Sequence, residues 1–81
     1  MKTIKIRFVN EKSRSRYKIQ KRGIFGRWKY IGYTVNMGYG SVYEYYSEDT
    51  KEKLLEEVLD KHYIVCYKHV NIIEYPEITI H

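Results

Sequence analysis

The stretch from Arg14 to Asn36 constrains the fold more than any other part of the chain. It contains two runs rich in aromatic and β-branched residues, joined by the short turn Gly23-Ile24-Phe25-Gly26. Glycine at both ends of so short a connection is typical of a β-hairpin. Because a connection of hairpin length cannot join parallel neighbours, this stretch excludes a purely parallel sheet.

The same stretch is basic and aromatic. It contains no acidic residue, and its cations are Arg14, Arg16, Lys18, Lys21, Arg22, Arg27 and Lys29. Interleaved with them are the rings of Tyr17, Phe25, Trp28, Tyr30 and Tyr33. The hairpin is therefore predicted to be a ribbon of cations and rings, and the functional hypotheses start from that surface.

Further strands are predicted on both sides of this ribbon. Residues 2–9 alternate, with Ile4, Ile6 and Phe8 on one face and cations on the other, as in a half-buried strand. The ribbon itself supplies strands at 16–22 and 27–36, within which Gly32 predicts a bulge or a close backbone approach. We expect a short strand at 42–46, one or two more within 63–75, and a last one at 78–80 after Pro76 interrupts the pattern.

One helix is predicted between these strands. Asp49 and Glu52 have the spacing of a capping box, so we expect the helix to begin at Asp49 and to end near His62. Its apolar stripe consists of Leu54, Leu55, Val58 and Leu59. The predicted fold is α+β, a single domain spanning 1–81. It has a single antiparallel sheet of about five strands with one helix packed on one face, in the order β-β-β-β-α-β.

The charge is divided unevenly along the chain. Residues 1–36 have eleven Lys and Arg and one acidic residue, a net charge of +10, whereas 37–81 have four Lys and nine acidic residues, a net charge of −5. Such a dipolar chain can attract an acidic partner through its basic half. The alternative is that the two halves neutralise each other within one fold.

Length and composition limit the class of protein. A chain of 81 residues has a thin core, so a deep catalytic cleft is not expected and a shared interface in a homo-oligomer is an open alternative. The single Cys66 excludes an intramolecular disulfide and favours a reducing compartment. We find no apolar run of membrane-spanning length and no signal peptide at the N-terminus, so we expect a cytoplasmic protein with no membrane partner.

Sequence patterns typical of catalysis or metal binding are weak. His62, Cys66 and His69 are potential zinc ligands, but no fourth ligand has matching spacing, and a buried, inert Cys66 is the simpler interpretation. The acidic residues 52–60 are predicted to form a solvated helix face rather than a pair with separated pKa values. We therefore expect a protein that is not an enzyme, with no cofactor and no metal site.

The leading hypothesis is a binding protein whose basic hairpin contacts an acidic partner, most simply nucleic acid. Lysine and arginine neutralise phosphates, and aromatic rings stack on bases. The predicted contact residues are Arg16, Lys18, Lys21, Arg22, Phe25, Arg27, Trp28, Lys29, Tyr30 and Tyr39. The alternative is that Trp28 and Tyr30 pack beneath the helix and the charges only solvate an exposed face.

A second hypothesis comes from a resemblance. Residues 17–22, the segment from Phe25 to Tyr33, and Tyr43-x-Tyr45-Tyr46 before Asp49-Thr50 resemble small uncharacterised accessory proteins of bacteriophages and bacterial mobile elements. This resemblance implies a protein that acts inside a bacterial host and binds and inhibits a host component, such as a defence protein. Tyr and Trp are enriched at binding hot spots, and Trp28, Tyr39, Tyr43 and Tyr45 supply such residues.

Overall fold

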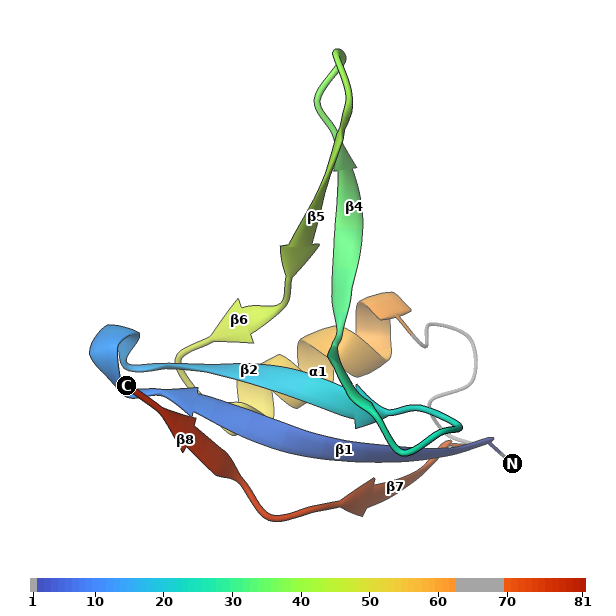
Figure 1. The fold of residues 1–81 in the computed structure, drawn as a ribbon, viewed down its shortest axis with the longest axis vertical. Coiled ribbons are helices and arrows are strands. Elements are labelled where there is room, and N and C mark those ends of the chain that lie inside the picture. The colour runs from blue at the N-terminus through green and yellow to red at the C-terminus, as the bar shows by residue number, and fades with distance from the viewer. Residues whose placement is uncertain (1, 63–69) are drawn as a thin grey trace.

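The computed structural model describes residues 2–62 and 70–81 and shows an α+β fold (Figure 1). Within these residues, six strands form one mixed sheet, two more form a separate hairpin, and one helix packs on the sheet. The elements in chain order are β1 (Lys2–Glu11), a 3-10 turn (Lys12–Arg14), β2 (Arg16–Arg22), β3 (Trp28–Tyr30), β4 (Gly32–Asn36), β5 (Ser41–Tyr45), β6 (Ser47–Glu48), α1 (Lys51–His62), β7 (Val70–Glu74) and β8 (Ile78–Ile80).

The centre of the sheet is β1, which pairs with strands from both ends of the chain. Its antiparallel partner is β2, and Phe8 lies opposite Ile19 in the register. Along its other edge, β7 and β8 run parallel to β1. The prediction of a single antiparallel sheet of about five strands is therefore wrong, because the sheet is mixed and contains six strands among the described residues. A local pattern identifies a strand but not its direction, and β7 follows a long connection of the kind that parallel pairing requires.

Pro76 separates the two parallel strands, as the sequence predicts. Just before it, the backbone amide of Tyr75 donates a hydrogen bond to the carbonyl oxygen of Ile6 at 2.7 Å. The pairing with β1 resumes at Ile78, which lies opposite Val9. A residue without an amide proton thus lies where the edge strand is interrupted.

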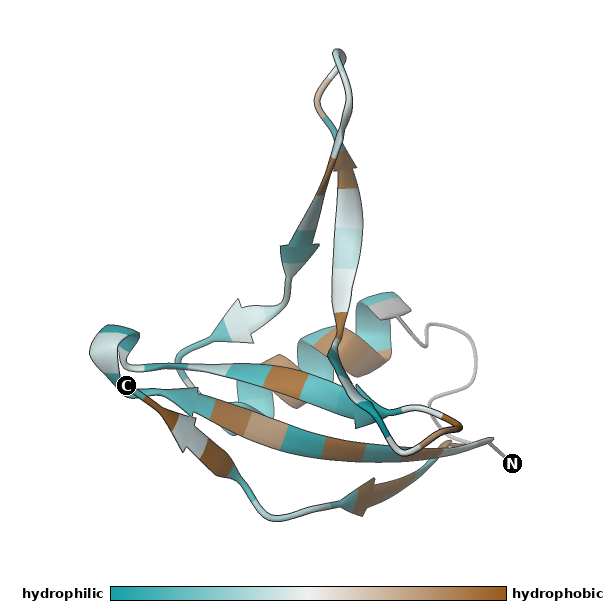
Figure 2. Ribbon diagram, in the orientation of Figure 1, coloured by the Kyte–Doolittle hydropathy of each residue, from teal (hydrophilic) through white to brown (hydrophobic). Residues whose placement is uncertain are grey.

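The hydrophobic core lies between the sheet and α1. Its buried members are Ile4, Ile6, Phe8, Ile19, Ile31, Tyr46, Leu54 and Val58. Leu54 and Val58 are one helical turn apart and fully buried, and Leu55 packs against the cluster, so the predicted apolar stripe is confirmed for these three residues, while Leu59 is only partly buried. Figure 2 shows the alternation along β1, with hydrophobic and hydrophilic residues in turn, as predicted for a strand with one buried face.

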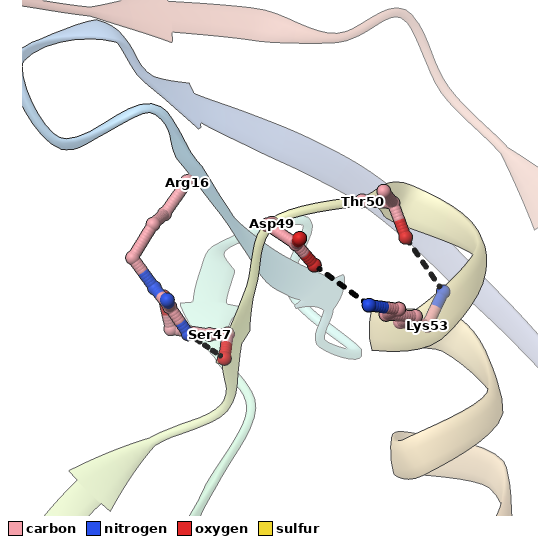
Figure 3. A network of polar contacts seen from close by, with 5 residues as sticks. All are labelled: Arg16, Ser47, Asp49, Thr50 and Lys53. Carbon is pink, nitrogen blue, oxygen red and sulfur yellow. Dashed lines mark hydrogen bonds and ion pairs between the residues drawn. The ribbon is translucent and has the colours of Figure 1, made fainter.

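The start of α1 differs by one residue from the prediction. The backbone amide of Lys53 donates to Thr50 Oγ1 at 3.3 Å, so Thr50 is the N-cap (Figure 3). Asp49 instead forms an ion pair with Lys53, with Oδ1 3.4 Å from Nζ. The predicted capping box of Asp49 and Glu52 is therefore wrong, because a lysine occupies the third helical position. The helix ends at His62, as predicted.

The strand predicted at 27–36 is divided at Ile31. Its first part, β3, pairs with β2, whereas its second part, β4, leaves the sheet and pairs with β5. Figure 1 shows the β4–β5 hairpin projecting away from the sheet and α1. The base of the hairpin is held by two backbone bonds, from Ile31 N to Ile19 O at 3.0 Å and from Tyr46 N to Ile31 O at 3.2 Å. The chain then returns to β2 as β6.

Gly32 lies where the projecting hairpin begins, at a position where no larger residue fits without a clash. A Cβ at this position would lie 2.2 Å from the carbonyl oxygen of Glu44 and 2.7 Å from the ring of Tyr43. Of the two alternatives predicted for Gly32, a bulge or a close backbone approach, the structure shows the close approach. Within the described ranges, no helix is both long enough and apolar enough to cross a bilayer.

Candidate nucleic-acid interface

The sheet face opposite α1 carries many of the rings and cations. Because Ile6 and Phe8 face the helix, the alternating residue Arg7 faces the other way. The same side continues across the sheet, since Arg7 lies opposite Gln20 and Gln20 lies opposite Tyr30. We call this surface the open face; it is formed by Arg7, Val9, Lys18, Gln20, Arg22, Trp28 and Tyr30, of which Val9 and Gln20 are buried.

Two arginines and two rings form a cluster on the open face. The Arg7 guanidinium carbon lies 4.4 Å from the centre of the Trp28 ring, and Arg7 Nε donates to Gln20 Oε1 at 2.7 Å. Trp28 meets Tyr75 edge-on with 5.2 Å between ring centroids. Arg22 lies over the Tyr75 ring and donates to its hydroxyl at 3.4 Å. We call these four side chains, Arg7, Trp28, Tyr75 and Arg22, the arginine–aromatic cluster.

A row of tyrosines continues from the open face onto the projecting hairpin. The centroids of Tyr30 and Tyr45 are 5.1 Å apart, and those of Tyr45 and Tyr43 are 5.5 Å apart. Lys18 Nζ lies 5.6 Å from the Tyr30 centroid and 5.5 Å from the Tyr45 centroid, within cation–π range. Lys18 also pairs with Glu11 at 3.3 Å, so its charge is partly neutralised.

The β2–β3 turn places two apolar side chains in solvent. Gly23 N donates to Arg27 O at 2.8 Å and Gly26 N donates to Gly23 O at 3.0 Å, which closes the turn. Gly26 has a φ of +80°, a conformation that glycine adopts without strain. Ile24 is 98% exposed and Phe25 is 93% exposed. Neither side chain contributes to the core, so the tip of this hairpin is available for contact.

Cations surround that tip. Lys21 and Lys29 lie directly opposite each other in the β2–β3 register, and Arg22 and Arg27 flank the turn. All four are exposed, and within residues 2–62 and 70–81 none lies within 4.0 Å of a carboxylate. A shallow hollow of about 740 Å³ is lined by Lys21, Gly23, Ile24, Phe25, Arg27 and Lys29. The turn is thus a positively charged end of the molecule with an apolar ring at its tip.

The structure separates the ten predicted contact residues. Around the β2–β3 turn lie Lys21, Arg22, Phe25, Arg27 and Lys29, and on the open face lie Lys18, Trp28 and Tyr30. Tyr39 lies at the tip of the projecting hairpin, between Gly38 and Gly40, with most of its ring exposed. These residues therefore do not form one continuous patch.

Arg16 is occupied by a structural contact. Its Nε donates to Ser47 Oγ at 2.9 Å and its Nη2 donates to the Ser47 carbonyl oxygen at 2.7 Å (Figure 3). Ser47 belongs to β6, the strand that follows the projecting hairpin. Arg16 is exposed, but these contacts tie β6 to the sheet and occupy its guanidinium.

The position of Trp28 differs from both alternatives raised by the sequence. Its side chain is half-buried, but it lies on the face away from α1, beneath Arg7 and beside Tyr75. The prediction did not include Arg7 or Tyr75. The alternation of residues 2–9 places Arg7 on the wet face and could have identified it, whereas Tyr75 reaches the cluster only through the parallel pairing of β7.

Ion pairs do not join the two halves of the chain in the described residues. The pairs are Lys18–Glu11, Lys51–Glu77, Lys53–Asp49 and Lys61–Glu57. Each of them links residues of the same half. The basic half is therefore not neutralised by direct contacts with the acidic half in this part of the structure.

The acidic residues of α1 include one unexpected pair. A hydrogen bond between Glu48 of β6 and Glu57 of α1 raises the pKa of Glu48 and lowers the pKa of Glu57. Lys61, 3.3 Å from Glu57 Oε1, lowers the pKa of Glu57 further. The predicted solvated helix face is confirmed at Glu52, Glu56 and Asp60, which are exposed, whereas Glu57 is partly buried and is paired with a carboxyl group from a strand.

Of the three possible metal ligands, His62 lies at the end of α1 and the other two lie outside the described residues. Cys66 and His69 lie outside the described residues, so the predicted inert Cys66 and the spacing with His62 stay predictions. In the part of the chain that the structure describes, no three His, Cys, Asp or Glu side chains gather as a metal site would require.

Comparison of the chain with protein-family models, with curated proteins and with solved structures found no match. A function for this protein therefore has to be inferred from its own geometry.

Proposed function

We propose that this protein binds nucleic acid, without catalysis, through the β2–β3 turn and the cations around it. The observation that carries the proposal is the pair Lys21 and Lys29, two like charges held directly opposite each other. Such a cross-strand pair destabilises a sheet, and no described carboxylate lies near enough to relieve it. A phosphate backbone would relieve this repulsion on binding.

The apolar tip of the turn supports the same proposal. Phe25 is held in solvent by a closed turn and is surrounded by cations on both strands. An exposed ring beside cations can stack on a base while the cations hold the adjacent phosphates. An aromatic residue that contributes nothing to the core thereby has a role in recognition.

The test is the affinity for a labelled oligonucleotide at two salt concentrations. If the four cations around the turn each neutralise one phosphate, the affinity should fall about 50-fold between 50 and 200 mM salt, from a slope of about −0.7 per contact for a single strand. Fluorescence polarisation measures this directly. No binding at the lower salt concentration would overturn the proposal.

A matched pair of double variants locates the contact. Arg27→Gln with Lys29→Gln removes two charges beside the turn, whereas Lys12→Gln with Arg14→Gln removes two charges at the opposite end of β2. We expect the first variant to lower the affinity and the salt slope, and the second to leave both nearly unchanged. Equal losses in the two variants would indicate attraction by net charge alone.

A second candidate function is binding to a host protein through the projecting hairpin. The observation that favours it is that residues 32–46 contain one charged residue, Glu44, although the side chains of β5 are all exposed. Exposed tyrosines on a segment that contains no lysine or arginine of its own suit a protein surface better than a phosphate backbone. With the resemblance to phage accessory proteins, this candidate is an inhibitor acting in the bacterial cytoplasm. A host partner that stays bound after nuclease treatment and is lost in Tyr43→Ser would support it.

A further inference from the structure

We infer that the open face binds a single strand of nucleic acid, with its phosphates on the arginine–aromatic cluster and its bases on the tyrosine row. This inference rests on the proposed function and specifies its substrate class as unpaired DNA or RNA. Arg22 links the two surfaces, because it lies beside the β2–β3 turn and also contacts Tyr75 in the cluster, whereas Lys21 and Lys29 alternate with it and point to the other face of the sheet. A strand held at the turn can therefore continue onto the open face.

Arg7 is oriented before any ligand arrives. Its Nε donates to Gln20, which is buried, and its guanidinium plane is held over Trp28. These two contacts leave its two terminal nitrogens with no carboxylate within 4.0 Å among the described residues. A fixed guanidinium fork binds a phosphate with little loss of conformational freedom, which a mobile surface lysine cannot do.

The tyrosine row provides ring surface next to this phosphate site. Tyr45 and Tyr43 are both exposed, and their rings lie 5.5 Å apart, centre to centre. Tyr30 connects them to the open face. Several rings in succession beside a cationic site suit successive bases of one strand.

Such rings distinguish single strands from duplexes. In a duplex the bases are stacked on each other and their flat faces are inaccessible, so a duplex can offer this surface only its phosphates. Unpaired bases can turn outward and stack on side chains. The combination of exposed rings on the projecting hairpin with a fixed guanidinium on the adjoining sheet face therefore favours the single strand.

The experiment compares a fluorescein-labelled 12-nucleotide single strand with its 12-base-pair duplex by fluorescence polarisation at about 100 mM salt. We expect the wild-type protein to bind the single strand at least 10-fold more tightly. Trp28 is the only tryptophan, and its fluorescence should change with the single strand and much less with the duplex. Equal affinities for the two probes would overturn the inference and leave the proposed function standing, whereas binding to neither probe would overturn both.

Two variants test the two parts of the surface separately. Arg7→Lys keeps the charge but loses the fork, and Tyr45→Ser removes a ring that is exposed on the projecting hairpin. Each should lower the affinity for the single strand at least 5-fold and change the affinity for the duplex less than 2-fold, with thermal melting to verify folding. Lys12→Gln is the control and should change neither affinity. If both variants bind the single strand as the wild type does, the open face is not the binding site, and the inference is wrong. This conclusion holds even if the double variant Arg27→Gln with Lys29→Gln shows that the β2–β3 turn binds nucleic acid.

Discussion

The two hairpins of this protein are of similar length but differ in charge and in support. The β2–β3 hairpin belongs to the main sheet, is backed by the core at Ile19 and is surrounded by cations at its turn. The β4–β5 hairpin leaves the sheet, exposes both of its faces and has Glu44 as its one charge between Gly32 and Tyr45. The first is therefore suited to a polyanion, whereas the second has no cation of its own and offers ring surface to unpaired bases or to an apolar protein surface.

The projecting hairpin is stabilised without a hydrophobic core of its own among the described residues. An isolated two-stranded hairpin is at best marginally stable in water. Here the projecting hairpin gains its stability at its base, from Gly32 and the tyrosine contacts Tyr30–Tyr45 and Tyr33–Tyr46. Figure 2 shows most of β4 and β5 in pale colours, with a hydrophobic band near their outer ends, where Val35 pairs with Val42. Its outer part is thus exposed and has no described core to bury it.

The largest difference between the hairpins should appear in stability. Ile19 of β2 is fully buried, so Ile19→Ala should lower the free energy of unfolding by about 2–5 kcal/mol. Val42 of β5 is 45% exposed, so Val42→Ala should cost less than about 1 kcal/mol. Urea denaturation followed by Trp28 fluorescence measures both. Equal costs would mean that the projecting hairpin is buried in solution, as it would be in a homo-oligomer.

One added methyl group at Gly32 should disrupt the close packing at the base of the projecting hairpin. Gly32→Ala would place a Cβ in contact with the Glu44 carbonyl oxygen, and relief of that clash should cost about 1–3 kcal/mol. The control is Gly40→Ala, because a Cβ at Gly40 meets nothing within 4 Å. Thermal melting and amide exchange at Tyr43–Tyr45 would detect the loss. A Gly32→Ala protein as stable as the Gly40→Ala protein would contradict the close packing at the hairpin base.

The tips of the two hairpins should differ in nucleic-acid binding. Phe25→Ala removes a ring flanked by cations, and a lost base stack should weaken oligonucleotide binding by about 1 kcal/mol, roughly 5-fold. Tyr39→Ala removes an equally accessible ring from the hairpin that has no cation of its own and should change the affinity less than 2-fold. Polarisation with the same probe measures both variants. The reverse order would assign nucleic-acid binding to the outer tip of the projecting hairpin.

The smallest predicted effect is a pH dependence of stability that comes from Glu48 of β6, the strand after the projecting hairpin, and its partner Glu57 of α1. Because the folded-state pKa of Glu48 is raised, its contribution to stability is present below the ordinary pKa of 4.5 and is lost as the pH rises through the raised value. The pKa of Glu57 is lowered, so its contribution is present above 4.5 and is lost as the pH falls through the lowered value. Once the pH has risen through the raised pKa of Glu48, both carboxylates are charged and repel each other.

Glu48→Gln tests this assignment. The amide can donate to Glu57 at every pH, so the variant should melt slightly higher than the wild type at pH 7, and the difference should disappear near pH 4. Glu56→Gln, an exposed change on the same helix, is the control. A variant that melts lower than the wild type at pH 7 would contradict a shared hydrogen bond between the two carboxyl groups.

The sequence by itself determined the local elements of this protein. Alternation identified β1 and the two faces of β2, the glycine-flanked turn identified the β2–β3 hairpin, and the spacing of leucines identified α1. These features depend on contacts between residues close in the chain, so periodicity and turn chemistry record them. The close approach at Gly32 also followed from the residue type alone.

Only the tertiary structure decided where these elements meet. The parallel pairing of β7 with β1, the departure of β4 from the sheet and the meeting of Arg7, Trp28 and Tyr75 all join residues far apart in the chain. Nothing in a strand's own pattern specifies its partner or direction, because the same alternation suits either edge of a sheet and either orientation. The candidate nucleic-acid surface is therefore predictable in its residue types and became a defined site only when the fold brought both ends of the chain to β1.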